Sequence, residues 1–401
     1  MAKIAVMGYG TIGSGVVEAL SMNQKSIQAK TEEEVSVKYV LDLRDFPGDP
    51  IQEKIVHDYQ VIAQDPEISV VVETMGGVEP ANTFAMAMLK AGKSVVTSNK
   101  ALVAEYGAEL METARENSCN FFFEASVGGG IPIIRPLYTC LTPDVVTEIA
   151  GILNGTTNYI LTEMSQKGVS FEEALKEAQA LGYAERDPSA DVEGHDACRK
   201  IAILSSVAMG RKVVFTDIHT EGITHVTTED FAYAKELGMS IKLLGISKMA
   251  DGAMESIVAP FLIRADHPLY SVQDVFNAVM VTGNVVDQLM FFGRGAGKLP
   301  TAAAVVADVI EAVKLKDVSE ALPWSKEVLT PDDYRSYESR FMVRLPESMD
   351  EKLYQELFRP QKVLKGIVAG ELAVITESMT EAQYLEAAKK AGNVIGSTRL
   401  Y

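Results

Sequence analysis

The chain has 401 residues, of which 47% are hydrophobic and 23% are charged, so it holds enough apolar side chains for two or three cores. Its formal net charge of −18 disfavours nucleic acid as a partner, because nucleic-acid phosphates need a basic surface, and such a charge instead keeps a protein soluble. No apolar run reaches the roughly 18 residues of a membrane helix, and the short apolar start that leads into Gly8 is not a signal peptide.

Cysteine usage points to a reducing compartment. The three cysteines, Cys119, Cys140 and Cys198, are odd in number and far apart, and no Cys-x-x-Cys pair occurs. Neither a disulfide framework nor a zinc site is therefore predicted. A cytoplasmic location is the simplest interpretation.

The first third of the chain alternates predicted strands with predicted helices. Strands are expected at Lys3–Met7, Val35–Leu41, Ser69–Glu73, Ser94–Thr97 and Asn120–Glu124. Helices are expected at Thr11–Leu20, Glu79–Ala91 and Ala101–Glu116. This alternation predicts an α/β domain whose parallel sheet is covered by helices on both faces.

A glycine motif, Gly8-Tyr9-Gly10-Thr11-Ile12-Gly13, lies between the first predicted strand and the first predicted helix. The first glycine of such a motif permits a tight turn, the second lets the backbone approach a pyrophosphate, and the third lets helix pack on strand. The helix N-terminus offers N–H groups and a positive dipole end to the phosphates. We therefore expect a Rossmann-type domain that binds NAD or NADP through Gly8, Gly10, Thr11, Ile12 and Gly13, with a chance glycine turn as the alternative.

The residues after the second predicted strand bear on the choice of cofactor. Asp42 would hold the adenosine ribose hydroxyls of NAD, whereas Arg44 would pair with the 2′-phosphate of NADP. An ordinary surface charge is the alternative for each residue, and the preference stays open.

Two polar motifs end later strands of the same predicted sheet. They are Glu73-Thr74-Met75-Gly76-Gly77 and Thr97-Ser98-Asn99-Lys100. In open α/β sheets, ligands bind beyond the carboxyl ends of the strands, so the nicotinamide and the substrate would meet there. Thr97, Ser98 and Lys100 are candidate site residues, although a lysine at a strand end can also be a solvated charge.

The pattern changes after Gly128-Gly129-Gly130. Further strands are expected at Thr147–Leu153, Ser240–Met249, Glu255–Ile263 and Ser271–Val281, interleaved with helices at Ser170–Leu181 and Gly194–Met209. This mixture predicts a separate α+β domain. The apolar segment Pro300–Val313 is expected to be a helix that returns to the first domain, and the stretch around Leu322–Asp333 to be a linker.

The tail has the strand and helix order of a ferredoxin-like unit. Its expected elements are Arg340–Leu345, Asp350–Phe358, Val363–Val368, Glu371–Thr376, Glu381–Ala391 and Asn393–Leu400. The predicted domains are a nucleotide-binding domain at 1–130 (completed by about 298–320), a substrate, catalytic and dimerisation domain at 131–297, a linker at 321–338 and the tail at 339–401.

Acidic residues gather before a predicted helix. Within nine residues stand Glu185, Asp187, Asp191 and Glu193. Asp196 and Lys200 follow, four residues apart and therefore on one face of the helix. Such a cluster suits a substrate ammonium and could place an acid beside a carbonyl, with an ordinary surface ion pair as the alternative.

Beyond the glycine motif, five blocks of sequence resemble segments of homoserine dehydrogenase. Together with the glycine motif they follow the family's order over roughly residues 8 to 310. They are Phe123–Ile134, Gly151–Leu161, Leu181–Pro188, Asp191–Lys200 and Gly293–Gly297 with the following Pro300-Thr301-Ala302. The resemblance implies a reversible, NAD(P)H-dependent reduction of L-aspartate 4-semialdehyde to L-homoserine, a step toward threonine, methionine and isoleucine.

The resemblance also assigns roles to residues. It implies that Lys200 is the proton donor and that Lys100 assists at the carbonyl. Gly182, Glu185 and Asp196 match residues that hold the amino acid, Asp191 is included from the acidic cluster, and Gly297 is expected to join the cofactor site. His195 has no matching role, and we interpret it as a packing or surface residue.

A monovalent-cation site of the family matches the Glu124 carboxylate and the backbone carbonyls of Val127, Gly129 and Ile131. Oxygen ligands suit a hard cation such as sodium or potassium rather than zinc. A hinge that needs small residues is the alternative, and the two interpretations are compatible.

The tail resembles the small regulatory ACT domain that follows many homoserine dehydrogenases. The Pro-Gly turn that such domains place after their first strand is replaced here by Leu345-Pro346-Glu347-Ser348-Met349. A structural, dimer-forming tail is therefore the alternative to an effector-binding one. A homodimer or homotetramer is expected.

Two other functions remain as alternatives to this prediction. The first is another two-domain NAD(P)-dependent dehydrogenase, against which the acidic cluster and Asn154-Gly155-Thr156-Thr157-Asn158 argue. The second is a catalytically silent nucleotide-binding sensor, against which the presence of Lys100, Asp196 and Lys200 argues.

Overall fold

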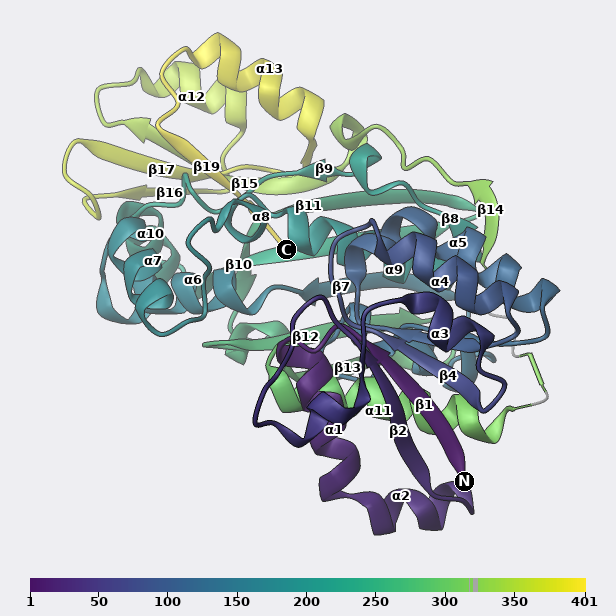
Figure 1. Cartoon of the computed structure of the whole chain (residues 1–401). Coiled ribbons are helices and arrows are strands. Elements are labelled where there is room, and N and C mark those ends of the chain that lie inside the picture. The colour runs from purple at the N-terminus through teal and green to yellow at the C-terminus, as the bar shows by residue number, and fades with distance from the viewer. Residues whose placement is uncertain (317, 320–323) are drawn as a thin grey trace. The chain divides into compact units, whose positions relative to one another are not determined.

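The computed structural model describes residues 1–316, 318–319 and 324–401, which form two compact units (Figure 1). The first unit comprises Met1–Val145, Ala202–Phe215 and Phe291–Leu329, and the second comprises Val146–Ile201, Thr216–Met290 and Thr330–Tyr401. The division into three domains and a linker stays a prediction. Residues 321–323 of the predicted linker, with 317 and 320 just before it, lie outside the described residues.

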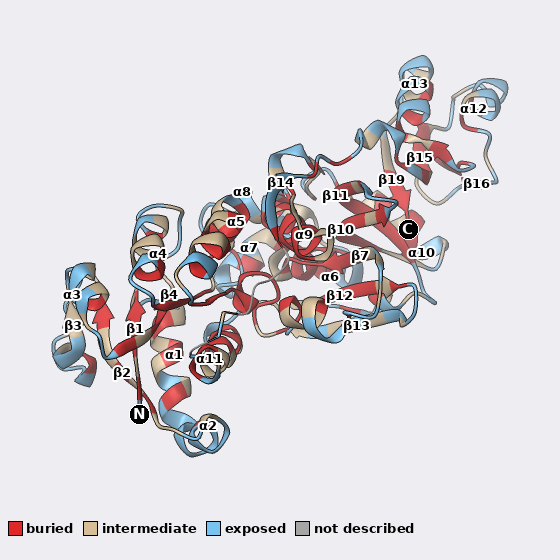
Figure 2. Ribbon diagram, turned by 90° about the vertical axis from the view of Figure 1, so that its right-hand side faces the viewer, coloured by how far each residue is buried: buried red, intermediate tan, exposed pale blue. Residues whose placement is uncertain are grey.

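The described part of the first unit contains a six-stranded parallel sheet in the order β3-β2-β1-β4-β5-β6. The strands are β1 (Ala2–Met7), β2 (Val35–Leu41), β3 (Ile55–Val56), β4 (Ile68–Glu73), β5 (Ser94–Thr97) and β6 (Phe121–Phe122). Apolar runs, rich in valine in β2, β4 and β5, form these strands because helices bury both faces of a parallel sheet. Figure 2 shows β1 and β4 buried. This order confirms the Rossmann-type α/β prediction.

Helices on this sheet include one from far along the chain. They are α1 (Thr11–Met22), α2 (Gln24–Thr31), α3 (Tyr59–Gln64), α4 (Ala81–Lys90), α5 (Lys100–Glu116) and α11 (Lys298–Lys314). Helix α11 packs closely on α1. A Cβ placed on Gly15 of α1 would lie only 3.2 Å from the Ala302 Cβ of α11. Val16 and Val305 share the core under these helices.

The second unit is built on a mixed sheet. Its described strands follow the order β13-β12-β7-β10-β11-β19-β15-β17-β16. We call the part of this unit before the tail the body. Its strands are β7 (Val146–Ile152), β9 (His219–Thr220), β10 (Met239–Ala250), β11 (Ala253–Arg264), β12 (Phe276–Gly283) and β13 (Asp287–Arg294). Strand β9 pairs with β11, and the last residues of β13 belong to the first unit. The body helices are α6 (Gly155–Lys167), α7 (Phe171–Ala180), α8 (Ser189–Val192), α9 (His195–Met209), which both units share, and α10 (Thr228–Glu236).

The tail has the predicted ferredoxin-like order of elements. These are β15 (Glu338–Pro346), α12 (Glu351–Phe358), β16 (Lys362–Lys365), β17 (Glu371–Ile375), α13 (Glu381–Ala391) and β19 (Gly396–Leu400). Figure 1 shows α12 and α13 together on one face of these strands. Strand β19 pairs in parallel with β11, Leu400 opposite Leu262, so the tail continues the sheet of the second unit.

Several elements differ from those expected. The strand expected from Ser271 begins at Phe276, because Pro268–Ser271 forms a short 3-10 helix. The stretch expected as a linker contains β14 (Ser325–Val328), which pairs with β8 (Arg211–Lys212), and Trp324 lies against Gly107. Over the described residues, no helix is both long and apolar enough to cross a membrane.

Candidate active site

A pocket of about 460 Å³ lies at the carboxyl ends of β1, β2 and β4, where the strand order of the first sheet changes direction. Ligands of open α/β sheets bind at this switch point. The pocket is lined by Gly8, Gly10, residues 41–44, His57, residues 74–76, Pro80 and Phe84.

The three motif glycines have the geometry of a pyrophosphate loop. Gly8 has φ +93° and its N–H donates to Leu41 O at 2.7 Å, which fixes the turn. Apart from its chain neighbours, no atom of the described residues lies within 4 Å of where a Cβ of Gly10 would stand, whereas a Cβ at Gly13 would lie 1.9 Å from Gly8 O. The second glycine therefore leaves open space, and the third permits close packing.

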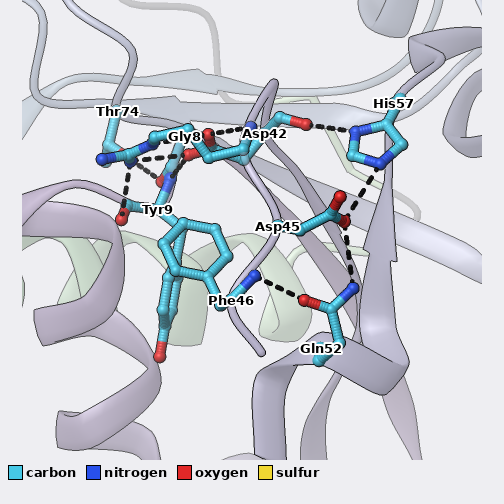
Figure 3. A network of polar contacts seen from close by, with 9 residues as sticks. Gly8, Tyr9, Asp42, Asp45, Phe46, Gln52, His57 and Thr74 are labelled. Carbon is cyan, nitrogen blue, oxygen red and sulfur yellow. Dashed lines mark hydrogen bonds and ion pairs between the residues drawn. The ribbon is translucent and has the colours of Figure 1, made fainter. Parts of the chain in front are cut away.

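Asp42 lines this pocket, and Figure 3 shows the network of polar contacts around it. The Asp42 carboxylate accepts hydrogen bonds from the Tyr9 N–H at 2.8 Å and from the Arg44 N–H, Nε and terminal nitrogen at 3.0 Å each. The side-chain bonds from Arg44 hold the pKa of Asp42 well below its usual range. Because a carboxylate has about four acceptor positions, Asp42 is saturated, and a ribose hydroxyl would have to displace Arg44.

His57 also lines the pocket and was not predicted from the sequence. Its Nδ1 lies 2.7 Å from Asp42 O and its Nε2 lies 3.4 Å from an Asp45 carboxylate oxygen, as Figure 3 shows. A lone histidine outside any motif gave no signal, because only the fold brings it beside Asp42.

The two strand-end motifs are joined by hydrogen bonds. The Thr97 hydroxyl donates to the buried Glu73 carboxylate at 2.5 Å, and the Asn99 side chain donates to Gly77 O at 2.5 Å. Burial raises the pKa of Glu73, and the bonds from Thr97 and nearby amides oppose this shift. Asn99 caps α5 through the Leu102 N–H at 3.1 Å, so this network fixes the helix end that carries Lys100.

The second unit brings an amide, two carboxylates and a lysine into one cluster. Lys200 Nζ lies 2.8 Å from Asp196 Oδ2 and donates to Leu153 O at 2.7 Å. The Asn154 amide donates to Asp196 at 2.9 Å and to Asp191 at 2.7 Å. The Asp196–Lys200 ion pair is not an ordinary surface pair, because Asp196 is 1% exposed and Lys200 is 7% exposed, whereas Asp191 is half-buried.

Local structure explains why these residues meet. Asp196 and Lys200 are one helical turn apart on α9. Asn154 follows β7 as the N-cap of α6 and accepts the Thr157 N–H at 2.8 Å, which fixes its amide. Asn154 was quoted within a block of the sequence but was not predicted as a site residue, although an asparagine before a helix is a cap signal.

The turn after α7 carries the other two substrate candidates. Gly182 has φ +76° and Glu185 has an exposed side chain. The Thr156 hydroxyl donates to Tyr183 O at 2.7 Å, which ties this turn to the start of α6. The structure therefore clusters Asp191, Asp196 and Lys200, with Glu185 on an adjoining turn.

The glycine run of the first unit packs against the segment before α11. A Cβ at Gly129 would lie 2.2 Å from Gly295 O, and the Gly130 N–H donates to Arg294 O at 3.1 Å. Gly297, with φ +120°, follows this segment as the N-cap of α11. Two sequence blocks far apart in the chain are thereby brought together.

The Glu124 carboxylate is buried and accepts three backbone hydrogen bonds, from Ile133, Ile134 and Arg135. Asp308 lies beside it and accepts the Glu124 N–H at 2.8 Å. Burial and then the charge of Glu124 raise the pKa of Asp308 to about 8. Among the described residues, no three His, Cys, Asp or Glu side chains could hold a metal together, so a cation at Glu124 would need backbone oxygens.

Two further observations bear on the sequence predictions. His195 is 54% exposed at its side chain and lies 3.1 Å from Glu193, as expected of a surface residue. None of the three cysteines, all of which the structure describes, forms a disulfide.

A Rossmann sheet with an open glycine loop, together with a buried carboxylate and lysine cluster, defines an NAD(P)-dependent oxidoreductase. Comparison with known proteins gives the particular family. A family model described as homoserine dehydrogenase, NAD binding domain, matches residues 8–124, and one described as homoserine dehydrogenase matches residues 132–310.

Relatives agree along most of the chain. The homoserine dehydrogenase of Synechocystis sp. is 46% identical over 331 residues, which cover 80% of this chain and 75% of that protein. That of Bacillus subtilis is 43% identical over 319 residues, which cover 78% and 73%. The structure of a homoserine dehydrogenase from Thiobacillus denitrificans matches with a TM-score of 0.91 and 34% identity, covering 100% of this chain and 98% of that one.

The chain therefore belongs to the homoserine dehydrogenase family. It is an NAD(P)-dependent oxidoreductase of aspartate-family amino-acid biosynthesis, and the two alternative functions are set aside. A hyperthermophilic archaeal homoserine dehydrogenase, solved in complex with NADPH, matches with a TM-score of 0.65 and 28% identity over 78% of this chain and 97% of that one.

Proposed function

We propose that the second unit holds L-homoserine or L-aspartate 4-semialdehyde at Asp191, Asp196 and the turn from Gly182 to Glu185. The observation that carries this proposal is the buried ion pair between Asp196 and Lys200, which Asn154 joins to Asp191. Carboxylates of this kind suit the substrate ammonium, and burial strengthens their attraction for it.

Lys200 is the proposed proton donor and acceptor. When bound, NAD(P)H supplies the hydride. As negative charge grows on the carbonyl oxygen of the semialdehyde, a proton moves to that oxygen from Lys200 Nζ, and Lys100 stabilises the charge. In the oxidation of homoserine, Lys200 takes the hydroxyl proton back. Asp196 and Leu153 O hold Nζ in one position for both directions.

The first unit is proposed to hold the cofactor. Gly8, Gly10, Thr11, Ile12 and Gly13 would bind the pyrophosphate, because α1 has no side-chain cap at Gly10 and its first N–H groups can serve phosphate oxygens. Asp42 and Arg44 would meet the adenosine ribose, and Thr97, Ser98, Lys100 and Gly297 complete the proposed set.

A monovalent cation, sodium or potassium, is proposed at Glu124 with the carbonyls of Val127, Gly129 and Ile131. Three of about four acceptor positions of the carboxylate are occupied by backbone N–H groups, which leaves room for one ion contact. The ion would hold the glycine run in shape. A higher melting temperature in sodium or potassium chloride than in choline chloride would support it.

A homodimer or homotetramer in the cytoplasm is also proposed. Strand β13 lies at one edge of the described sheet of the second unit, and Met290 and Phe292 on one face of it are 43% and 54% exposed. An exposed apolar edge strand invites association with a second copy. Sedimentation of the purified chain would test this proposal.

Steady-state kinetics test the proposed reaction. The purified chain should oxidise NADH or NADPH with L-aspartate 4-semialdehyde and reduce NAD or NADP with L-homoserine. Turnover of a different amino acid or sugar acid in place of homoserine would overturn the substrate assignment, whereas cofactor binding without turnover of any substrate would overturn the catalytic roles.

A further inference from the structure

Arg399, on strand β19 of the tail, is buried and holds two carboxylates. Its guanidinium donates to Glu381 of α13 at 2.9 and 2.7 Å, and to Glu221, which follows β9 in the body, at 2.8 and 2.6 Å. Arg399 is 6% exposed, so these bonds satisfy a charge that is almost fully shielded from water. Removing such a buried partner leaves an uncompensated charge, which is strongly destabilising.

Glu221 is held in place from two sides. Its Oε1 lies 2.7 Å from His219 Nε2, and the His219 ring stacks on Tyr334 with centroids 3.7 Å apart. Burial opposes ionisation of Glu221, but hydrogen bonds from His219 and Arg399 outweigh it and lower the pKa to about 2. The carboxylate is therefore ionised at ordinary pH and keeps its pairing with Arg399.

The backbone next to Glu221 packs against the backbone of the substrate cluster. The Ile223 N–H donates to Val192 O at 2.8 Å. A Cβ at Gly222 would lie 2.1 Å from Val192 O, so the two chain segments touch with no room for a side chain. Gly194, with φ +83°, also packs closely against this segment, since a Cβ at Gly194 would lie 3.0 Å from the Cγ2 of the Thr220 side chain.

The contacted segment carries the proposed substrate residues. Val192 follows Asp191, whose carboxylate accepts the Asn154 amide. Gly194 O accepts the Cys198 N–H at 2.9 Å in the first turn of α9, the turn that contains Asp196. Residues 220–223 therefore pack against the backbone segment that carries the carboxylates of Asp191 and Asp196.

We propose that Arg399 is a positioning residue for the substrate site, acting through Glu221 and the 220–223 backbone on Asp191 and the start of α9. This inference rests on the proposed substrate role of Asp191 and Asp196. Arg399 itself touches no reacting atom. Its loss should therefore weaken binding of the amino acid while leaving the cofactor, which binds in the first unit, unaffected.

Arg344 offers a matched control. It lies on β15 of the tail, is 4% exposed, and likewise pairs with one tail carboxylate, Glu371, and one body carboxylate, Asp230 of α10. Both arginines are thus buried, and each pairs with one carboxylate of the tail and one carboxylate outside it. They differ in that Asp230 is not part of the 220–223 segment.

The experiment compares Arg399→Met with Arg344→Met in the full chain. We expect Arg399→Met to raise the KM for homoserine about ten-fold, within the range of coupling through packed networks, with the KM for NADP or NAD unchanged. Arg344→Met should lower the melting temperature comparably without that rise in KM. An unchanged KM in Arg399→Met, or equal rises in both variants, would overturn the positioning role.

A second pair of variants covers the case in which Arg399→Met does not fold. Glu221→Gln weakens the contact that leads to the substrate cluster, whereas Glu381→Gln weakens only the contact within the tail. The KM for homoserine should rise in Glu221→Gln and not in Glu381→Gln, and the opposite result would overturn the proposal. If the wild-type chain does not turn over homoserine, the proposed function fails first, so the two failures are distinguishable.

Discussion

The Lys200 ammonium lies 2.8 Å from the Asp196 carboxylate, and both side chains are almost fully buried. Loss of either partner leaves a buried charge, which costs stability as well as function. Asn154 adds Asp191 to the same cluster, so these side chains act as a unit. Each substitution here therefore needs a folding control beside its kinetics.

Lys200→Ala should lower kcat about 10²–10⁴-fold, the typical contribution of a positioned acid or base. Cofactor affinity, measured by fluorescence titration with NADPH, should be nearly unchanged. Lys176→Ala is the matched control, because Lys176 is an exposed lysine on α7 of the same unit. Near-normal turnover in a folded Lys200→Ala chain would remove Lys200 from the mechanism.

Glu185→Gln should raise the KM for homoserine about ten-fold or more, because a hydrogen bond to a charged group contributes about 1.5–3 kcal/mol. Asp196→Asn should act in the same direction and also disturb Lys200, so Glu185→Gln is the cleaner variant. Glu193→Gln serves as control, because Glu193 is exposed and pairs with His195. An equal loss of cofactor binding in Glu185→Gln would assign this residue to the cofactor or to folding.

Local patterns predicted the elements whose signals are local. The buried apolar runs of β1 and β4 and the glycine motif before α1 could be predicted because their signals lie in consecutive residues. Helix α6 was missed because Gly155-Thr156-Thr157-Asn158 has low helix propensity, and its Asn154 cap and tertiary packing outweigh this.

Contacts between distant segments were not predictable from the sequence. Nothing in the sequence near Leu400 indicates that this residue pairs with Leu262 of β11. Asp196 and Lys200 were predicted to share a face, but their burial depends on β7 and α6. The Asn154 bridge likewise joins carboxylates that lie 37 and 42 residues further along the chain.

Arg44→Ala should raise the KM for NADPH about ten-fold or more and change that for NADH little. Arg44 reaches past Asp42 to Tyr9 O at 3.2 Å, beside the pocket where a 2′-phosphate would stand, and a charged pair with phosphate is a strong interaction. Kinetics with both cofactors, measured side by side, check this. Equal effects on the two cofactors would show that Arg44 only supports the loop.

Lys242 predicts a pH dependence of stability. It is 2% exposed on β10, and burial lowers its pKa from 10.5 to about 8 against the opposing charge of Asp274. The folded chain releases this proton at lower pH than the unfolded chain, so the cost of burying the charge is present below about pH 8 and is relieved toward pH 10.5.

The stability of the wild-type chain relative to Lys242→Met should therefore rise by on the order of 2–3 kcal/mol as the pH goes from about 7 to about 10. Urea unfolding at several pH values measures this difference, in which the titration of other groups cancels. A difference that is constant or that falls with pH would contradict the lowered pKa.

Deletion of residues 339–401 should lower stability or change the oligomeric state more than it lowers kcat. The deletion removes Arg399 and Arg344, which leaves Glu221 and Asp230 without these partners, and it exposes the edge of β11 that β19 covers. A truncated chain that keeps its melting temperature and its sedimentation coefficient would contradict this.

Threonine at millimolar concentration should inhibit the full-length chain weakly or not at all. An effector carboxylate at the turn after β15 would need backbone N–H groups, but the Glu347 N–H donates to Gly370 O at 2.9 Å and the Met349 N–H to Pro346 O at 2.9 Å. The exposed Glu347 carboxylate adds repulsion at the same place. Initial rates at several threonine concentrations, with Glu347→Gln as the variant that relieves the repulsion, measure the response. Sigmoidal inhibition of the full-length chain that disappears when the tail is deleted would overturn this prediction and give the tail a regulatory role.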